Sequence, residues 1–288
     1  MLDGADLDSS EDPLLRDAFI YEMLIAHEHQ HNETMLQLIQ MVDSYEPVER
    51  DPAPAAEPAP DGPEMVRVEK GEVEIGAGPH GFAYDNERPR HPRELEEFWI
   101  DRTPVTNGAF ARFVEETGAE PPRYWERDQG GWARTTMGGS ESLDPRQPVI
   151  HVSWHQADAF ARWAGKRLPS EFEWEAAARG SDRERANLDQ LAFACAPAGA
   201  YADTCSECGA VQMLGDVWEW TSSDLAAYPG FAPFPYPEYS QVFFGDEYKV
   251  LRGGSWATRR DVIRPTFRNW DYPQRSQLFA GFRCARDG

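Results

Sequence analysis

The sequence predicts an α+β protein in which one long helix precedes an irregular, loop-rich domain. Residues 14–46 contain neither glycine nor proline, whereas all ten tryptophans lie after residue 63. Helix-like and strand-like segments follow one another there without the regular alternation of a parallel βαβ array. With 41% hydrophobic residues, the 288-residue chain can bury a sizeable core, so a globally disordered chain is excluded.

The N-terminal segment, up to about residue 45, is predicted to form a single helix over residues 13–44. Pro13 suits a first helical position, and Ser10 or Asp12 can cap it. Apolar residues recur at helical spacing: Leu15, Phe19, Met23, Met35, Leu38 and Val42. Because helix stability comes mostly from packing, and only the following domain is available as a neighbour, we expect this helix to be partly exposed.

Residues 46–63 contain six prolines in 18 positions and are predicted to be an extended linker. Beyond it, alternation of apolar and charged residues in MVRVEKGEVEIGA predicts strands. Further short strands are expected in PVIHVSW, GDVWEW, YKVLRGGSW and AGFRCA.

Three shorter helices are predicted within the domain from their end signals. One has Thr106 as its N-cap and Gly118 as its stop, and a second ends at Gly165. The third begins with a capping box, in which Ser170 is followed three residues later by Glu173, and it stops at Gly180.

The charge of the chain excludes several classes of partner. Lys and Arg total 28 against 50 Asp and Glu, a net charge of −22. Such an acidic surface repels nucleic-acid phosphates and anionic lipids. No apolar run approaches the ~20 residues that span a bilayer, the start does not resemble a signal peptide, and four cysteines do not make a disulfide scaffold. We therefore expect a cytoplasmic protein that acts without nucleic acid or membrane.

The strongest local signal for chemistry is AHEHQHNETM. His27 and His31 are four residues apart, so they share a helix face and can offer two imidazoles to one metal, with Gln30 beside both. Glu33 and His29 lie roughly 200° around the helix from His31, so a third ligand must come from elsewhere. The alternative is a solvated, histidine-rich turn. The lone Cys-x-x-Cys at Cys205 and Cys208 is interpreted as incidental thiols, because zinc would need two more ligands.

Two further segments concentrate polar and aromatic groups. In FRNWDYPQR, a guanidinium and a carboxylate lie close together, a combination that suits a zwitterionic ligand or a structural salt-bridged turn. The residues concerned are Arg268, Asn269, Trp270, Asp271 and Arg275. The proline-rich segment YPGFAPFPYPEYS offers three tyrosines as acids or packing residues: Tyr228, Tyr236 and Tyr239.

These segments together resemble a known family. Residues 64–288 resemble the formylglycine-generating, or sulfatase-modifying-factor, fold, a variant of the C-type lectin fold, through RPRHPRELEEFWIDRTPVTNGAF, RLPSEFEWEAAARG, GDVWEWTSS, VLRGGSW and GFRCA. The preceding helix resembles the end of the helical-bundle domain of ergothioneine-biosynthesis sulfoxide synthases, whose iron signature His-x-x-x-His-x-Glu is matched by His27, His31 and Glu33. The expected organisation is the last helix of a four-helix iron-binding bundle (1–45), a linker (46–63) and a lectin-like domain (64–288).

The resemblance implies a non-heme Fe(II) enzyme that uses O2 to join the sulfur of γ-glutamylcysteine to C2 of the imidazole of hercynine, and that oxygenates this sulfur. His27 and His31 match two iron ligands. Gln30, Asn269 and Trp270 match residues beside the trimethylammonium group of hercynine, while Asp271 and Arg275 match residues that hold γ-glutamylcysteine. Tyr236 matches the catalytic tyrosine, with Tyr239 as the fallback.

Two departures from the family pattern keep alternatives open. The third iron-ligating histidine of the family lies on an earlier helix, together with an arginine that contacts γ-glutamylcysteine, and this chain begins after that helix. We therefore expect either a truncated chain, inactive as it stands, or a second chain that supplies the rest. The copper-binding cysteines of formylglycine-generating enzymes are absent from GGSWATRRDVIR, which argues against that activity.

The runner-up interpretation is a non-catalytic lectin-like binding module. The resemblance leaves open a structural Ca²⁺, the oligomeric state, and cysteine in place of γ-glutamylcysteine as the sulfur donor.

Overall fold

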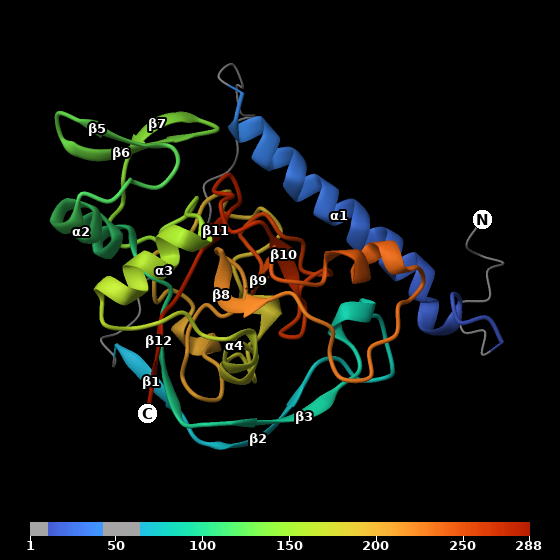
Figure 1. Ribbon diagram of the computed structural model, residues 1–288. Coiled ribbons are helices and arrows are strands. Elements are labelled where there is room, and N and C mark those ends of the chain that lie inside the picture. The colour runs from blue at the N-terminus through green and yellow to red at the C-terminus, as the bar shows by residue number, and fades with distance from the viewer. Residues whose placement is uncertain (1–10, 43–63) are drawn as a thin grey trace.

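A computed structural model describes residues 11–42 and 64–288 of the chain (Figure 1). Its α-helices are α1 (Phe19–Gln40), α2 (Asn107–Thr117), α3 (Trp154–Trp163) and α4 (Glu171–Ala177). Short 3-10 turns are η2 (Arg16–Ala18), η3 (Asp85–Glu87), η4 (Arg183–Arg185), η5 (Ala202–Thr204), η6 (Pro237–Tyr239) and η7 (Gln241–Phe243). Its strands are β1 (Met65–Val68), β2 (Gly71–Ile75), β3 (His91–Leu95), β4 (Phe98–Asp101), β5 (Trp125–Asp128), β6 (Gly131–Thr136), β7 (Gly139–Ser142), β8 (Trp218–Asp224), β9 (Lys249–Arg252), β10 (Asn269–Asp271), β11 (Ala280–Gly281) and β12 (Ala285–Asp287).

The strands form several small sheets, joined by long loops. A four-stranded sheet has the order β10-β9-β8-β11, with β11 parallel to β8 and the other pairs antiparallel. A three-stranded sheet, β1-β4-β12, pairs the first and last strands of the domain with the same neighbour. A hairpin, β2-β3, and a meander, β5-β6-β7, lie at the periphery. This arrangement confirms the predicted α+β class.

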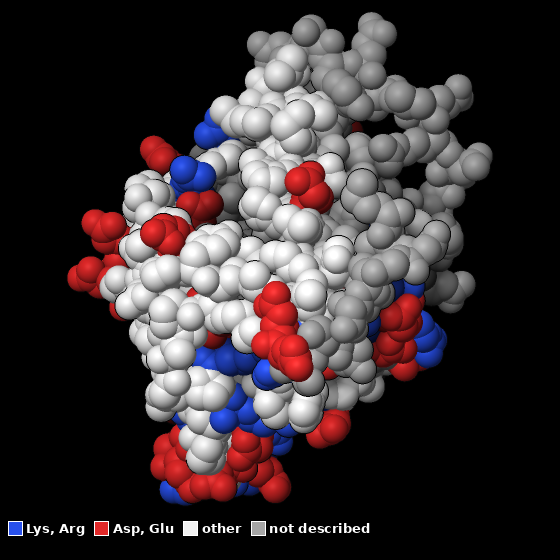
Figure 2. Space-filling view, turned by 90° about the vertical axis from the view of Figure 1, so that its right-hand side faces the viewer, with Lys and Arg blue, Asp and Glu red and all other residues white. Residues whose placement is uncertain are grey.

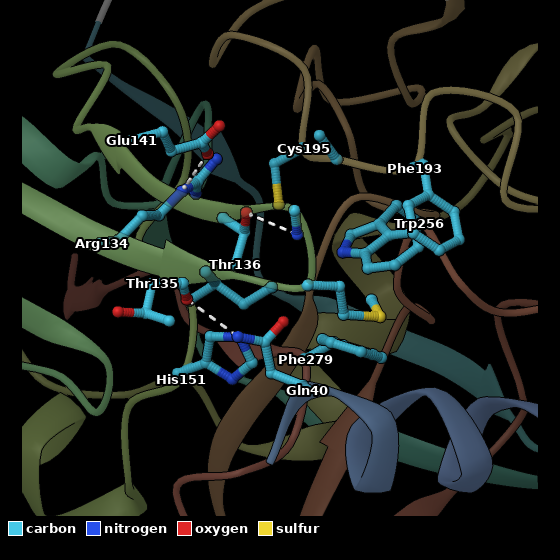
Figure 3. Close-up of a pocket in the computed structure, with 14 residues that line it drawn as sticks. Gln40, Arg134, Thr135, Thr136, Glu141, His151, Phe193, Cys195, Trp256 and Phe279 are labelled. Carbon is cyan, nitrogen blue, oxygen red and sulfur yellow. Dashed lines mark hydrogen bonds and ion pairs between the residues drawn. The ribbon is translucent and has the colours of Figure 1, made fainter. Parts of the chain in front are cut away.

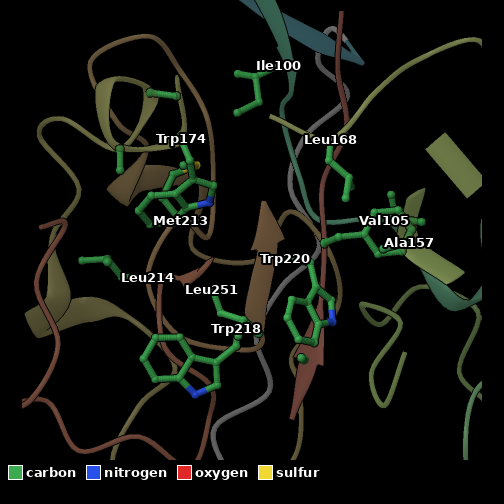
Figure 4. Packing of buried hydrophobic residues seen from close by; sticks show 14 of the residues in the cluster. Ile100, Val105, Ala157, Leu168, Trp174, Met213, Leu214, Trp218, Trp220 and Leu251 are labelled. Atoms are coloured by element: carbon green, nitrogen blue, oxygen red, sulfur yellow. The ribbon is translucent and has the colours of Figure 1, made fainter. Parts of the chain in front are cut away.

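The hydrophobic core lies between the sheets and helices α2, α3 and α4. Trp174, Trp218 and Trp220 gather around Leu251 of the central sheet (Figure 4). All four side chains are buried. Burial of these apolar side chains stabilises a fold that has little regular secondary structure.

Buried ion pairs tie the loops to this core. Arg283 donates to both carboxylate oxygens of Glu219 at 2.7 Å, and it also donates to the backbone carbonyls of Asp101, at the end of β4, and Val211. Arg268 bonds Glu171 at 2.8 and 2.9 Å. Both arginines are fully buried, and each has the paired, hydrogen-bonded environment that a buried charge requires. Of the FRNWDYPQR cluster, Arg268 is therefore a structural residue and not part of a ligand site.

The first helix is shorter than predicted. It starts at Phe19, because Asp17 and Ala18 adopt left-handed backbone conformations, with φ of 53° and 56°, that interrupt helical geometry. Asp12 caps only the preceding turn, where its Oδ1 accepts a bond from the backbone N–H of Leu14. The helix ends at Gln40. Ser10, the end of the expected helix and the linker of residues 46–63 lie outside the described residues.

Helix α1 packs along one side of the domain (Figure 1). Its N-terminal part is anchored by Phe19, whose ring centroid lies 5.4 Å from that of Phe82 and 4.7 Å from that of Phe234. Met23 is also buried. The rest of the predicted apolar stripe faces away from the domain, with exposed side chains at Met35, Leu38 and Val42. The helix is thus partly exposed, as expected, although the stripe is not one continuous buried face.

Most of the end signals within the domain are confirmed. Thr106 accepts a bond from the N–H of Ala109, Gly118 is left-handed, and Ser170 and Glu173 form the capping box. The prediction of a strand in PVIHVSW is wrong. His151, in its middle, has a φ of +64°, which breaks the extended conformation and leaves a single bridge between Pro148 and Thr106.

No helix within the described ranges is long and apolar enough to cross a membrane. Figure 2 shows one face of the molecule, on which Asp and Glu side chains gather toward the lower and left margins beside smaller groups of Lys and Arg.

Candidate active site

A cavity of about 570 Å³ lies between α1 and the domain. Five parts of the chain contribute to it: one side of α1, the start of β8, the loop that contains η6 and η7, strand β10, and Leu278. Its lining residues are His27, Gln30, His31, Glu33, Thr34, Gln37, Trp218, Tyr236, Glu238, Tyr239, Phe243, Asn269, Trp270 and Leu278. Six of the eight residues proposed from the sequence are therefore brought together: His27, Gln30, His31, Tyr236, Asn269 and Trp270.

The two imidazoles of α1 lie side by side at this cavity. The ring centroids of His27 and His31 are 4.4 Å apart, with 66° between the ring planes. Neutral imidazole nitrogens suit Fe(II) and other first-row metals, so this pair fits two positions of such a site. Within residues 11–42 and 64–288, no three His, Cys, Asp or Glu side chains are grouped closely enough to hold a metal ion. The described residues thus offer two ligands.

Glu33 is not available as a ligand, because its carboxylate is buried and fully engaged by the domain. The indole Nε1 of Trp218 and the hydroxyl of Ser255 both donate to Oε1 at 2.7 Å, and the hydroxyl of Thr258 donates to Oε2 at 2.7 Å. Burial raises the pKa of Glu33, and these three hydrogen bonds act in the opposite direction. The third residue of the His-x-x-x-His-x-Glu signature therefore fastens the helix to the domain.

The role of Glu33 could have been found from spacing alone. The buried residues of α1 are Phe19, Met23, Ala26, Glu33 and Gln40, which recur at intervals of three, four and seven residues. This is the spacing of one helix face. Two of the five are polar, so the apolar residues alone mark only three positions of this face.

Two residues of the cavity lining, Gln30 and Tyr239, form a small cluster with Tyr84, which lies behind the lining. The hydroxyl of Tyr84 donates to Oε1 of Gln30 at 3.4 Å, and the ring of Tyr84 stacks on that of Tyr239 with centroids 4.2 Å apart. Burial raises the pKa of Tyr84 to about 12 and that of Tyr239 well above its usual value. Both hydroxyls therefore stay protonated. Tyr84 was not singled out by the sequence analysis.

Tyr236 and Tyr239 occupy different environments, although only three residues separate them. Tyr236 is 41% exposed and presents its side chain to the cavity. Tyr239 is stacked between neighbours and contacts Tyr84 and Gln30. The accessible phenol is thus Tyr236.

Aromatic side chains of the domain form another part of the lining, the aromatic wall. The ring of Trp270 lies 6.1 Å from that of Tyr239 and 5.5 Å from that of Phe243, and Trp218 lines the same cavity. Beside Trp270, the amide Oδ1 of Asn269 accepts a bond from the Trp270 backbone N–H at 2.9 Å. Aromatic faces of this kind attract quaternary ammonium groups.

Asp271 and Arg275 are not brought into the lining of this cavity. They form an ion pair with each other, with 3.3 Å between Arg275 Nε and Asp271 Oδ1. Burial raises the pKa of Asp271, while the backbone N–H of Tyr272 and the charge of Arg275 act in the opposite direction. Arg275 is about half-exposed.

The other candidate ligands lie away from the histidine pair. His29 lines a separate cavity on another side of α1, together with Asn32 and Arg259, as its helical position predicts. His80, His91, His151 and His155 are absent from the lining of the histidine-pair cavity. Cys205 and Cys208 are free thiols.

The loop-rich fold and the family match together place this protein in the sulfatase-modifying-factor class. Residues 50–288 match the model of the sulfatase-modifying factor enzyme 1-like domain. Among solved structures, PvdO from Pseudomonas aeruginosa superposes with a TM-score of 0.59 at 24% identity, covering 83% of this chain and 100% of PvdO. The predicted formylglycine-generating-enzyme-like fold is confirmed.

Sequence identity to individual relatives identifies the family within this class. The chain is 42% identical to the hercynine oxygenase of Mycolicibacterium thermoresistibile, over 94% of this chain and 69% of the relative. It is 43% identical to the hercynine oxygenase of Mycobacterium tuberculosis, over 94% of this chain and 72% of the relative. The chain therefore belongs to the hercynine oxygenase family of sulfatase-modifying-factor proteins.

Proposed function

We propose that this protein is a non-heme iron oxidoreductase of ergothioneine biosynthesis, which joins the sulfur of γ-glutamylcysteine to C2 of the hercynine imidazole and oxygenates that sulfur with O2. The observation that carries the proposal is the single cavity in which His27, His31, Gln30, Tyr236 and Trp270 meet. The names of the hercynine oxygenase relatives support the choice of substrate. The choice of metal is inferred from the two neighbouring imidazoles, His27 and His31.

In this proposal His27 and His31 would hold Fe(II), and the metal would supply the activation of O2. Their rings are neighbours on one helix face and border the cavity. A third ligand is expected from outside the described residues, either from this protein or from a second chain. Glu33 holds the helix in register with the domain through Trp218, Ser255 and Thr258, so the imidazoles keep a fixed position relative to the aromatic wall.

The aromatic wall and its polar neighbours are proposed to bind hercynine. The trimethylammonium group keeps its charge at every pH and has no N–H to donate, so an aromatic face is its natural partner. A cation–π contact with Trp270 is worth about 0.5–2 kcal/mol, depending on how far the pair is desolvated. Gln30 and Asn269 line the same space, and they are proposed to lie beside the trimethylammonium group together with Trp270.

Tyr236 is proposed as the proton donor, and Asp271 with Arg275 as the recognition pair for γ-glutamylcysteine. A protonated phenol that faces the cavity can deliver its proton to reduced oxygen and so limit wasteful oxidation of the thiol. The carboxylate of Asp271 suits the ammonium of a γ-glutamyl group, and the guanidinium of Arg275 suits its carboxylate. Ligand binding exchanges their mutual ion pair for two new ones.

The test loads the protein anaerobically with Fe(II), in a form that includes the source of the third iron ligand, and then adds hercynine, γ-glutamylcysteine and ¹⁸O2. Mass spectrometry is expected to detect a sulfoxide conjugate that carries one ¹⁸O atom. His31→Ala is the matched negative control. Binding of hercynine without any conjugate, even after Fe(II) loading, would favour the alternative of a non-catalytic lectin-like module.

A further inference from the structure

A short segment of the chain, residues 235–239, carries both tyrosines that line the histidine-pair cavity. One buried carboxylate, that of Asp85 in η3, holds both ends of this tyrosine loop. Its Oδ2 accepts a hydrogen bond from the backbone N–H of Phe234 at 3.2 Å, and its Oδ1 accepts one from the hydroxyl of Ser240 at 2.6 Å. The two bonded residues directly flank the loop, so a single side chain fixes where the loop begins and where it ends.

The turn η3, which carries Asp85, is itself anchored in the domain. All three of its residues are buried. The carboxylate of Glu87 accepts a hydrogen bond from Nε of Arg264 at 2.8 Å. The backbone carbonyl of Asn86 accepts one from the guanidinium of Arg268 at 2.7 Å. The bonds of Asp85 therefore tie the tyrosine loop to a fixed part of the molecule.

Asp85 has no cation as a partner. Within the part of the chain that the structure describes, it forms no ion pair, and the two arginines that bond to η3 are paired with other carboxylates. Burial raises the pKa of Asp85, and its hydrogen bonds to the two flanking residues act in the opposite direction. A carboxylate that is buried without a cation destabilises a fold unless hydrogen bonds compensate for its lost hydration. The bonds to the tyrosine loop supply this compensation.

The backbone of the tyrosine loop decides where the phenol of Tyr236 lies. The side chain of Tyr236 is 41% exposed, whereas the ring of Tyr239 is stacked on that of Tyr84. An exposed side chain depends on its backbone for its position. Proton transfer takes place over hydrogen-bond distance, and a displacement of about 1 Å can slow a step ~100-fold. Loosening of the loop is therefore expected to disturb Tyr236 more than Tyr239.

We propose that Asp85 is a positioning residue for the reaction: by fixing the tyrosine loop at Phe234 and Ser240, it holds the phenol of Tyr236 where it can pass its proton to reduced oxygen. The inference rests on the proposed function, in which Tyr236 is the proton donor. Without the carboxylate of Asp85 the phenol is still present, but it is in position for a smaller fraction of the time. More of the turnover then ends in oxidised thiol.

The first test is hydrogen exchange of the full chain, which does not depend on activity. Asp85→Ala removes both acceptors and is expected to accelerate exchange in residues 234–240 at least tenfold, without a change in α2. Asp85→Asn can keep both contacts, because its amide oxygen accepts from the N–H of Phe234 and its amide NH2 donates to the hydroxyl of Ser240. Exchange in this variant should rise less than threefold. Parental exchange in Asp85→Ala would show that Asp85 does not hold the loop.

The second test measures the ratio of conjugate to oxidised thiol, in a form of the protein that includes the source of the third iron ligand. Asp85→Ala is expected to lower this ratio at least fivefold, and Asp85→Asn should retain at least half of it. In a chain that already carries Tyr236→Phe, Asp85→Ala should change the ratio less than twofold, because no phenol is left to position.

A matched control separates positioning from a general loss of stability. Arg134, like Asp85, is a buried charged residue with two side-chain hydrogen bonds, from Nε to Glu141 and from Nη2 to Gln147, both at 2.8 Å. It lines a separate cavity of about 210 Å³ (Figure 3), which shares no lining residue with the histidine-pair cavity. Arg134→Ala is expected to lower the melting temperature and to leave the product ratio within twofold of the parent.

The outcomes distinguish this inference from the proposed function on which it rests. If the parent protein forms no conjugate, the proposed function fails and the role of Asp85 falls with it. If the parent forms conjugate, a parental ratio in Asp85→Ala, an equal fall in Arg134→Ala, or a further fall in the Tyr236→Phe chain would each overturn the role of Asp85 alone. If Asp85→Ala does not fold, Ser240→Ala removes one of the two bonds and takes its place in both tests.

Discussion

The indole Nε1 of Trp218 donates a 2.7 Å hydrogen bond to the carboxylate of Glu33, across 185 residues of sequence. Glu33 lies two residues after His31 on α1, and Trp218 begins the central strand β8. The bond therefore joins the helix that carries the imidazoles directly to the core of the domain. Both partners are buried, so water does not compete for it.

Removing the carboxylate of Glu33 is expected to undock α1. Glu33→Leu leaves three buried donors without an acceptor, on Trp218, Ser255 and Thr258, and each costs about 1–3 kcal/mol. Glu33→Gln keeps one oxygen and is expected to cost less. Hydrogen exchange along residues 19–40 should accelerate strongly in the Leu variant and modestly in the Gln variant. Equal protection in both variants and in the parent chain would show that the helix is held by its apolar contacts alone.

The stability of the fold is expected to fall below neutral pH because of His151. Burial and Arg134 lower its folded-state pKa to about 3, whereas in the unfolded chain the ring takes up a proton below about pH 6.5. The stability that the fold gains from keeping the His151 ring neutral is therefore complete above pH 6.5. It is lost as the pH falls toward 3, by at most about 1.4 kcal/mol per pH unit.

Urea denaturation at pH 5 and pH 7 measures this effect, with His151→Asn as the comparison. The parent chain is expected to lose roughly 2 kcal/mol more than the variant over this interval, because only the parent carries the imidazole. Identical losses would mean that His151 is not held neutral in the folded state.

Local signals in the sequence predicted the parts of the structure that depend on neighbouring residues. Thr106, Gly118 and the Ser170–Glu173 box mark helix ends, because a cap acts within one turn. The pairing of His27 with His31 follows in the same way from helix geometry. The co-location of this pair with Tyr236 and Trp270 was implied by the family resemblance, since no local pattern relates residues so far apart.

The parts that were missed depend on distant contacts. Ser255 and Thr258 carry no local signal, and they matter only because Glu33 is placed against them. Tyr84 lies behind the cavity lining, where it stacks on Tyr239, 155 positions later. The strand expected around His151 fails because tertiary packing imposes a backbone conformation that β-propensity opposes.

Tyr236→Phe is expected to slow formation of the carbon–sulfur bond by about 100-fold and to divert turnover toward thiol oxidation, because the cavity loses its accessible proton donor. Tyr239→Phe is the matched comparison. Its hydroxyl is buried against Tyr84 and Gln30, so a smaller change in the product ratio is expected. The ratio of conjugate to oxidised thiol, measured in a catalytically active form, decides between them. If Tyr236→Phe keeps the rate and the product ratio of the parent chain, Tyr236 is not the proton donor, and Tyr239 becomes the candidate.

Asp271→Asn is expected to weaken the use of γ-glutamylcysteine more than that of hercynine. The carboxylate is proposed to receive the ammonium of the γ-glutamyl group, and a lost charged hydrogen bond of about 1.5–3 kcal/mol corresponds to at least a tenfold rise in KM. The KM for hercynine should change less than twofold. Asp246→Asn, at an exposed position, controls for the loss of one negative charge. An equal rise in KM for both substrates would show that Asp271 does not bind the γ-glutamyl group selectively.

The affinity of this chain for Fe(II) depends on the number of ligands at the cavity. The described residues bring two imidazoles to the cavity and no third ligand, so we expect this chain to bind Fe(II) weakly in an anaerobic titration. His27→Ala and His31→Ala should each lower the affinity by at least about tenfold, equivalent to about 1.4 kcal/mol. His29→Ala removes an imidazole from the same helix, but from a side that faces a different cavity, so the affinity should stay unchanged. Tight, stoichiometric iron in the parent chain would contradict the two-ligand site, because another side chain would then have to complete it. An equal loss in all three variants would mean that iron binds non-specifically to a histidine-rich turn.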